Sequence, residues 1–420
     1  MYNTKGCCLF EDQLEFFSPM PQRIDGPVRE GLPESFDLHV APSACGRRMA
    51  IGAYRRHSRH RRAHLYISES DIVSGCYEDL VPEAVEQILA TVKPAPRAIS
   101  VIVTCIDDLL GTDHEALLML LKRRFPATHF CIRRVDPIRR HSALPPPVNM
   151  QVSLFSMLDP SPQHDDGVNL IGNMPPITKR SELFALAGGM GLTVRQIDDC
   201  ATFDDFLDMS KSRLNLVTTP TGLAAAQEME RRLGIPYLYA PGSYSVERIA
   251  EVYRSMAERT GRSLPDLSPF RTPAEQKIAQ ARGHLGGTPI VVDSSGDLLP
   301  LSLARALLEY GFQVRLVLEN LIFDGDLTDY HWIREHHPEV EIAPPNSPEL
   351  GKRAREFEGC VCIGFSSAYQ LGARHLVDFP DLSFDYGFHA VCVLMDKLIS
   401  ALDQEADFGK IMRESEGMKR

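Results

Sequence analysis

The sequence predicts an α/β protein made of three successive doubly wound domains, each built on a parallel sheet. Three observations favour this class: the length of 420 residues, a strand–turn–helix pattern that repeats from about residue 64 onward, and two Pro-rich stretches that interrupt it. A chain of this length exceeds the size at which one hydrophobic core keeps growing, so two or three domains are expected. Strands that alternate with helices are typical of parallel sheets.

The first predicted domain covers residues 1–160. The run HLYIS predicts a strand, and VPEAVEQILATV predicts an amphipathic helix after it. RAISVIVTC is the next strand, IDDLLGTDHEALLMLLKRRFP follows as helical sequence, and THFCIRRV is again extended. Asp113 or Thr112 is expected to cap the helix HEALLMLLKRR, with Gly111 supplying the turn before it.

Pro-rich sequence predicts the domain boundaries. LPPPVNM at 144–150 and LDPSPQHDDG at 158–167 suit a break between domains, and SLPDLSPFRTPAE at 263–275 suits the next linker. The second domain, 161–270, is expected to contain the strands VNLIG, LTVRQID and LNLVTTP with helices between them. The third domain, 271–420, opens with the strand–loop–helix–strand run TPIVVDSSGDLLPLSLARALLEYGFQVRLVLEN.

Composition limits the class of protein. The chain has 44% hydrophobic and 24% charged residues and no apolar stretch long enough to span a bilayer, which indicates no membrane helix and a cytoplasmic location. A net charge of -11 argues against general nucleic-acid binding. The sequence has no G-x-x-x-x-G-K-[ST] motif for ATP and no G-x-G-x-x-G after a predicted strand for a nicotinamide cofactor.

The stretch from residue 38 to residue 68 contains no Asp or Glu but is rich in arginine. Its guanidinium groups could form a solvated helix face, bind the carboxylates of an anionic ligand, or dock an acidic protein partner. The candidate residues for ligand binding or docking are Arg47, Arg48, Arg55 and Arg56, and the stretch also contains Arg59, Arg61 and Arg62.

Three cysteines near the N-terminus stand beside glycine or at the end of a predicted strand: Cys7 or its neighbour Cys8, then Cys45, then Cys105. Cys45 ends an extended run and precedes helical, arginine-containing sequence, and both influences favour the thiolate. Thiolates hold iron–sulfur clusters, which usually take four protein ligands. Three ligands therefore suggest a site that a partner chain completes.

Other cysteines carry weaker signals. Cys76 follows a glycine near a predicted strand end and is an alternative ligand within the chain. The remaining ones are expected to be buried and inert, since ten cysteines in a cytosolic chain do not form a disulfide scaffold. These are Cys131, Cys200, Cys360, Cys362 and Cys392.

The order of several short motifs resembles that of the component 1 subunits of nitrogenase and nitrogenase-like oxidoreductases. The motifs are Gly6–Cys7, ACG at 44–46, SESDIVSG at 68–75 and TCIDDLLGTD at 104–113. Farther along, LNLVTTP with GIPYLY is similar to the second-domain hallmark of that family, and GFQVRLV to its third domain. Each motif alone is weak, whereas their order and spacing are fairly specific.

This resemblance implies three Rossmann-like domains and a paired, paralogous component 1 subunit, in a hetero- or homodimer. It implies that Cys7, Cys45 and Cys105 ligate an iron–sulfur cluster shared with that subunit, either 4Fe–4S or larger and P-cluster-like. It also implies that electrons come from a separate ATP-hydrolysing iron–sulfur reductase. Whether this chain is the α- or the β-type subunit stays open.

The sequence also departs from the family. The α-type subunit of molybdenum nitrogenase holds its catalytic cofactor through a Cys just before the third domain and a His in a Tyr-His-Gly-Phe run. Here residues 252–290 contain no Cys, and Tyr386 stands where that His would be. We therefore expect a relative that is not nitrogenase proper: an oxidoreductase subunit that relays electrons to an unidentified substrate, or alternatively a non-catalytic scaffold for cofactor assembly.

Overall fold

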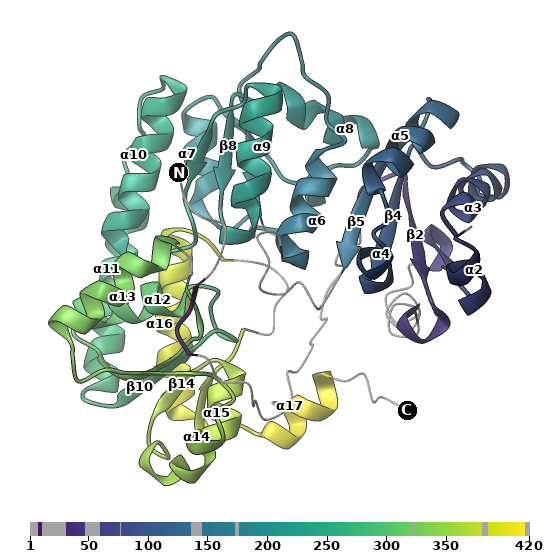
Figure 1. The fold of residues 1–420 in the computed structure, drawn as a ribbon. Helices are drawn as coiled ribbons and strands as arrows, with labels where there is room; N and C mark the ends of the chain where they lie inside the picture. The colour runs from purple at the N-terminus through teal and green to yellow at the C-terminus, as the bar shows by residue number, and fades with distance from the viewer. Residues whose placement is uncertain are drawn as a thin grey trace.

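Three parallel sheets with helices around them form the protein, as a computed structural model shows (Figure 1). The structure describes residues 7–10, 31–46, 59–75, 77–135, 145–172, 176–322, 324–379 and 385–415. Within these ranges every strand of the three large sheets runs parallel to its neighbours. The predicted α/β class is confirmed.

The first sheet has the strand order β3-β2-β4-β5. Its strands are β2 (Ser35–Ala41), β3 (Arg62–Tyr66), β4 (Ala98–Thr104) and β5 (His129–Val135). The helices that follow them are α2 (Glu69–Ser74), α3 (Tyr77–Thr91), α4 (Cys105–Leu110) and α5 (His114–Arg124). Asp113 caps α5 through the amides of Glu115 and Ala116, as the sequence predicts.

The two faces of this sheet differ in polarity. Phe36, Leu38 and Val40 of β2 belong to one buried apolar cluster, to which α3 contributes Val85 and α5 contributes Leu121. Side chains of a strand alternate between faces, so the residues between these three point the other way. They include Asp37 and His39, which are 7% and 6% exposed. One face of the sheet is therefore a hydrophobic core and the other carries buried polar groups.

The second sheet has the order β7-β6-β8-β9. Its strands are β6 (Gly167–Ile171), β7 (Thr193–Arg195), β8 (Leu214–Val217) and β9 (Tyr237–Tyr239). Its helices are α6 (Pro146–Phe155), α7 (Glu182–Gly189), α8 (Phe203–Leu207), α9 (Leu223–Leu233) and α10 (Val246–Thr260). Ala98 and Cys131 of the first sheet share a core with Phe155 and Phe203, so the first two sheets are packed together.

The third sheet has the order β13-β11-β10-β14-β15. Its strands are β10 (Pro289–Asp293), β11 (Gln313–Leu318), β13 (Glu341–Ala343), β14 (Val361–Ile363) and β15 (His375–Val377). The helices around it are α11 (Ser268–Leu285), α12 (Pro300–Glu309), α13 (Asp324–His336), α14 (Pro348–Lys352), α15 (Phe365–Leu371), α16 (Phe388–Asp403) and α17 (Phe408–Ser415). The short strand β1 (Cys7–Cys8) pairs antiparallel with β12 (Leu321–Ile322) beside this sheet.

Two helices occupy stretches that the sequence predicts as linkers. Helix α6 begins at Pro146 inside the first Pro-rich break and packs on both β5 and α9. Helix α11 begins at Ser268 inside the second. Proline is tolerated in the first turn of a helix because amides there have no helical acceptor, so Pro-rich sequence alone does not exclude a helix start. The domain boundaries near residues 160 and 270 stay predictions.

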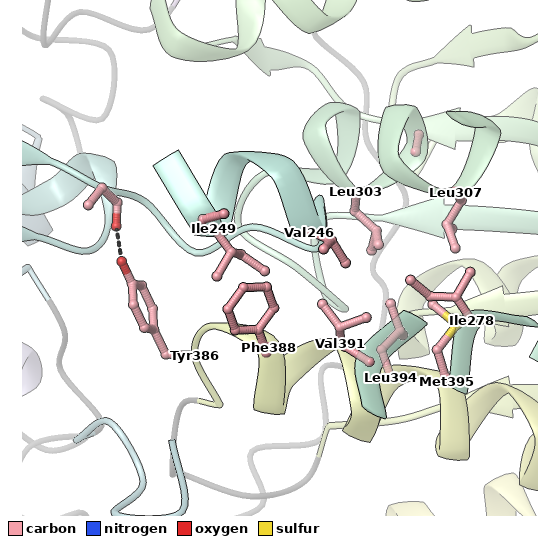
Figure 2. Close-up of a cluster of buried hydrophobic side chains, with 14 of the residues drawn as sticks. Val246, Ile249, Ile278, Leu303, Leu307, Tyr386, Phe388, Val391, Leu394 and Met395 are labelled. Atoms are coloured by element: carbon pink, nitrogen blue, oxygen red, sulfur yellow. Dashed lines mark hydrogen bonds between the residues drawn. The ribbon is translucent and has the colours of Figure 1, made fainter. Parts of the chain in front are cut away.

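Helices α10, α11, α12 and α16 join the second and third sheets in one apolar core (Figure 2). Val168 and Leu170 of β6 belong to the same cluster as Ile290 and Val292 of β10. In Figure 2, Phe388 of α16 lies among side chains of α10, with the rest of the helix extending toward α11 and α12. No helix in the described ranges is both long and apolar enough to cross a membrane.

Buried hydrogen bonds hold the start of α16 against the second sheet. Glu182, at the start of α7, accepts hydrogen bonds from the hydroxyl of Tyr253 (2.7 Å) and from the amides of Phe388 (2.6 Å) and His389 (3.0 Å). The Tyr386 hydroxyl donates to the carbonyl of Ala240 over 2.8 Å, as Figure 2 shows. One carboxyl group thus connects three helices.

We predict that Glu182→Ala lowers the free energy of unfolding by about 3 kcal/mol or more, because it leaves three buried donors without an acceptor. Glu182→Gln keeps one acceptor oxygen and should cost less. Urea unfolding followed by circular dichroism measures both, with Glu258→Ala on the exposed face of α10 as control. Equal stability of Glu182→Ala and the control would contradict the assignment.

A second prediction concerns His39, whose pKa burial lowers from 6.5 to about 4. The unfolded chain restores a pKa near 6.5, so between about pH 6.5 and pH 4 only the unfolded state binds the proton. Stability is therefore lost as the pH falls through this window, by about 2 kcal/mol at pH 5. His39→Gln should remove this loss, whereas His164→Gln, at an exposed site, should keep it. Urea unfolding at about pH 7.5 and pH 5 tests this; equal losses in wild type and His39→Gln would refute it.

Candidate metal centre

Cys45 and Cys105 stand at the same edge of the first sheet. Strands β2 and β4 are parallel neighbours whose register pairs His39 with Ile102, so their carboxyl ends lie at the same level. Residues 43–46 form a helical turn after β2 and contain Cys45. Cys105 follows β4 directly and is the first residue of α4. Two thiol groups are therefore positioned where ligands bind in open parallel sheets.

Local packing explains the residues that flank these cysteines. A Cβ at Gly46 would lie 1.7 Å from the ring of His64, so a larger residue beside Cys45 would force the imidazole to move. His64 Nε2 lies 3.2 Å from the carbonyl oxygen of Ala41, at the end of β2. At the start of α4, the amide of Thr104 donates to the carboxylate of Asp107 over 3.1 Å. Gly111 ends that helix with φ of 70°.

Exposed apolar side chains occur on the elements at this edge. Cys45 is exposed and Cys105 is partly exposed. Nearby side chains on α4, α2 and the end of β3 are Leu109, Val73 and Tyr66, exposed by 75%, 88% and 61%. Large apolar side chains gathered on a soluble surface often mark a protein interface.

A group of buried charges lies on the polar face of the same sheet. The carboxylate of Asp37 is 3.7 Å from Arg62 Nη2 and 3.8 Å from Arg133 Nη1. His39 lies two residues farther along β2 on the same face, and its Nε2 atom has no hydrogen-bond partner among the residues that the structure describes. The sequence interpretation missed this group. Its signal is the alternation of polar and apolar residues in SFDLHVA and RAHLY, which differs from the continuous apolar runs of a strand buried on both faces.

Cys7 and Cys8 lie elsewhere in the fold. Cys7 pairs with Ile322 and Cys8 with Leu321, and the amide of Leu9 donates to Asn320 over 2.8 Å. In Figure 1 this dark purple strand lies among the green and yellow elements around the third sheet, away from β2 and β4. The side chains of both cysteines lie outside the described part of the chain. The ligand set of Cys7, Cys45 and Cys105 stays a prediction.

Several predicted residues fall outside the described ranges: the alternative ligand Cys76 and the arginines Arg47, Arg48, Arg55 and Arg56. Two other arginines of that stretch make internal contacts. Arg61 donates to the carbonyl of Ser35 over 3.1 Å and to its hydroxyl over 2.9 Å. Arg62 faces Asp37.

The remaining cysteines are buried or half-buried, as expected. Burial raises the pKa of the thiols of Cys360, Cys362 and Cys392, which keeps them protonated and unreactive. Cys131 and Cys200 lie in hydrophobic core. None of these five stands at the cysteine edge of the first sheet.

Tyr386 is a structural residue. Its ring is buried, and burial raises the pKa of its phenol, which therefore remains a hydrogen-bond donor to Ala240. His389, two residues beyond Gly387, points its Nε2 to Asp385 at 3.4 Å. Tyr386, which stands at the position of a metal-binding histidine in the related α-type subunit, is thus hydrogen-bonded within this chain.

Within the described ranges, no three His, Cys, Asp or Glu side chains gather closely enough to hold a metal ion. The cysteine edge by itself offers two soft sulfur donors on neighbouring strand ends. Sulfur donors suit iron–sulfur clusters, and a cluster usually needs four protein ligands. The donor chemistry fits such a cluster, and the number of donors requires further ligands.

Comparisons with known proteins agree on one family. Residues 31–402 match the family model described as nitrogenase component 1 type oxidoreductase. A nitrogenase iron-molybdenum cofactor biosynthesis protein, NifE, from Sinorhizobium fredii (strain NBRC 101917 / NGR234) is 26% identical over 268 residues, which are 59% of this chain and 52% of that protein. This chain therefore aligns with about half the length of that relative.

Solved structures give the same answer for the fold. The structure titled "Nitrogenase Cp1 at pH 6.5" superposes with a TM-score of 0.69 at 15% identity and covers 96% of this chain and 93% of its own. "Nitrogenase Cp1 at pH 5" gives 0.61 at 14% identity, with 96% and 88% covered. The expected Rossmann-like architecture is confirmed. With the family model spanning most of the sequence, the chain belongs to the nitrogenase component 1 type oxidoreductase family.

Proposed function

We propose that this chain is one subunit of a nitrogenase-like two-component reductase. In this role it relays low-potential electrons from an ATP-hydrolysing iron–sulfur reductase through a shared iron–sulfur cluster to an unidentified substrate. The observation that carries the proposal is the placement of Cys45 and Cys105 on neighbouring strand ends of the first sheet. Family membership supports the same reaction class.

Cys45 and Cys105 would hold the cluster from this chain, together with Cys7 or, as alternatives, Cys8 and Cys76. The cluster, 4Fe–4S or larger, would supply the one-electron chemistry. The protein's own contribution is positional. The capped start of α4 fixes the backbone of Cys105, and the contact of Gly46 with His64 fixes the turn of Cys45.

The exposed apolar side chains support a partner subunit at this edge. Leu109 and Val73 stand beside a half-set of ligands, so one surface would both bury them and complete the cluster. The partner would be a paralogous component 1 subunit, in a hetero- or homodimer. The arginine stretch that contains Arg47 and Arg55 would bind an anionic ligand or dock an acidic partner, and we place the complex in the cytoplasm, with neither membrane nor nucleic acid as partner.

A specific observation favours a second candidate, a non-catalytic scaffold on which a metallocluster is built. The relative described above is named as a cofactor biosynthesis protein. Tyr386 is compatible with this role too, because its hydroxyl is bonded to Ala240 within the protein and would not hold on to a metal cluster that a scaffold must release.

Turnover separates the two functions. The purified complex would be incubated with its reductase, ATP and an electron donor under anaerobic conditions. Repeated conversion of a small molecule, with ATP consumed in every cycle, would exclude the scaffold. Release of one cluster per complex to an acceptor protein, without further turnover, would exclude the reductase.

For the ligands, we predict that Cys45→Ala or Cys105→Ala reduces the iron content of anaerobically purified protein to background and abolishes its broad visible absorbance. Cys392→Ala, which alters a half-buried thiol on α16, should keep both. Cys8→Ala should be tolerated if Cys7 is the ligand, and the opposite result would reassign the site. Unchanged iron in both the Cys45 and Cys105 variants would refute the assignment.

For the interface, we predict that Leu109→Asp weakens subunit pairing at least about tenfold, because a large side chain contributes about 1.5–3 kcal/mol when buried and a charge there adds a penalty. Met119→Asp on α5 alters a similarly exposed apolar residue, 66% exposed, and serves as control. Analytical ultracentrifugation over a range of concentrations measures the pairing. Equal dissociation constants for the two variants would place the interface elsewhere.

A further inference from the structure

Strand β1 consists of two adjacent cysteines. In β12, Ile322 is the partner of Cys7, and Leu321 is the partner of Cys8. Neighbouring residues of a strand lie on opposite faces, so this register places one cysteine on each face of the ladder. A slip of β1 by one residue would exchange the two faces. The register of this short strand therefore decides which cysteine is presented to which side.

The two cysteines cannot specify this register themselves. The register of a strand is normally set by a pattern of unlike side chains, which makes one alignment better than its neighbours. Cys7 and Cys8 are identical, so this pattern is absent from β1. Contacts outside the two paired residues must therefore hold the alignment.

Asn320, the residue before β12, makes such contacts. Its carbonyl oxygen accepts a hydrogen bond from the amide of Leu9 over 2.8 Å. Its side-chain Oδ1 accepts a second one from the amide of Phe10 over 2.9 Å. The side chain of Leu9 also packs against the apolar core of the second and third sheets. These contacts fix the position of the chain along β12, since a slip by one residue would break both hydrogen bonds.

The buried carboxyl group of Glu319 holds Asn320 in place. Glu319 follows β11 and is 7% exposed. Its Oε1 accepts hydrogen bonds from the amides of Asn320 over 2.7 Å and of Leu321 over 2.8 Å. The amide of Glu319 donates to the carbonyl of Ala343, the last residue of β13, over 3.1 Å. Asn320 is thus attached to the third sheet, and its two acceptors have a fixed direction.

We propose that Asn320 is a positioning residue that fixes the register of β1 and thereby selects which of Cys7 and Cys8 becomes the N-terminal cluster ligand. The selection rests on the proposed function, in which one of these two thiols joins Cys45 and Cys105. The other cysteine of the pair then stands on the opposite face of the ladder and is not a ligand. Asn320 acts on the ligand through the backbone of residues 9 and 10.

Alkylation of the metal-free full chain tests the register without iron. Iodoacetamide is added for short times, and fragmentation mass spectrometry measures the ratio of modification at Cys7 and Cys8. We expect unequal alkylation in wild type, because the two faces of the ladder have different surroundings. In Asn320→Ala the ratio should move toward equality, and Asn320→Asp, which keeps an oxygen acceptor, should restore it. The same ratio in wild type and Asn320→Ala would overturn the proposal.

Hydrogen exchange measures the two bonds directly. The amides of Leu9 and Phe10 should be protected in wild type, and the amide of Phe10 should exchange about fivefold faster in Asn320→Ala, because one hydrogen bond is lost. The wild-type measurement keeps the test valid if Asn320→Ala does not fold, which circular dichroism checks. Unprotected amides at both positions in wild type would overturn the proposal.

Asn149→Ala is the matched control for these measurements. Oδ1 of Asn149 accepts a hydrogen bond from the amide of Arg134 over 2.9 Å, so this substitution removes the same kind of bond beside β5. The alkylation ratio and the exchange of the Phe10 amide should equal those of wild type. A control that changes the ratio as much as Asn320→Ala does would contradict a specific role of Asn320.

Iron content tests the selection itself. Cys7→Ala and Cys8→Ala are each purified anaerobically with their partner, with Asn320 intact and with Asn320→Ala. With Asn320 intact, one variant should lose its iron and the other should keep it. In Asn320→Ala the two iron contents should converge, because a slipped strand lets the remaining cysteine take the ligand face. An unchanged contrast would overturn the selection. A wild-type chain without iron would instead refute the proposed function, and the alkylation ratio would still decide the register.

Discussion

The buried carboxyl group of Glu182 is the contact on which the relation between the second and third sheets depends. It joins α7, α10 and the start of α16 through three hydrogen bonds, beside a core that is mainly apolar. Apolar packing tolerates sliding, whereas a carboxyl group with three fixed donors permits one arrangement. The apolar core supplies most of the favourable free energy of folding. The hydrogen bonds of Glu182 set how the second and third sheets are placed relative to each other.

The two faces of the first sheet differ in polarity: one packs into a hydrophobic core and the other carries buried charged groups. The charged face holds Asp37 between two arginines while its neighbour His39 stays neutral, since burial lowers the pKa of His39. Cys45 follows β2, the strand that carries Asp37 and His39 of this charged face.

The sequence predicts the order of strands and helices well, because each βα unit is encoded locally by periodicity and by caps such as Asp113. It also predicts that Cys45 and Cys105 each stand at the end of an extended run, because apolar strand-like sequence precedes both. It fails at Pro146 and Ser268, where helices start inside Pro-rich sequence. It equally misses the charged group of Asp37, Arg62 and Arg133, whose residues come from three different strands and meet only through tertiary packing.

The antiparallel pairing of β1 with β12 has a consequence for the energetics of the whole chain. It attaches the Cys7 segment to the loop after β11, whereas Cys45 and Cys105 belong to the first sheet. A metal cluster that used all three would be a crosslink between the two ends of the protein. The affinity for the metal would then be thermodynamically linked to how the first and third sheets are placed relative to each other. A strain on that placement would lower the metal affinity and appear as loss of iron.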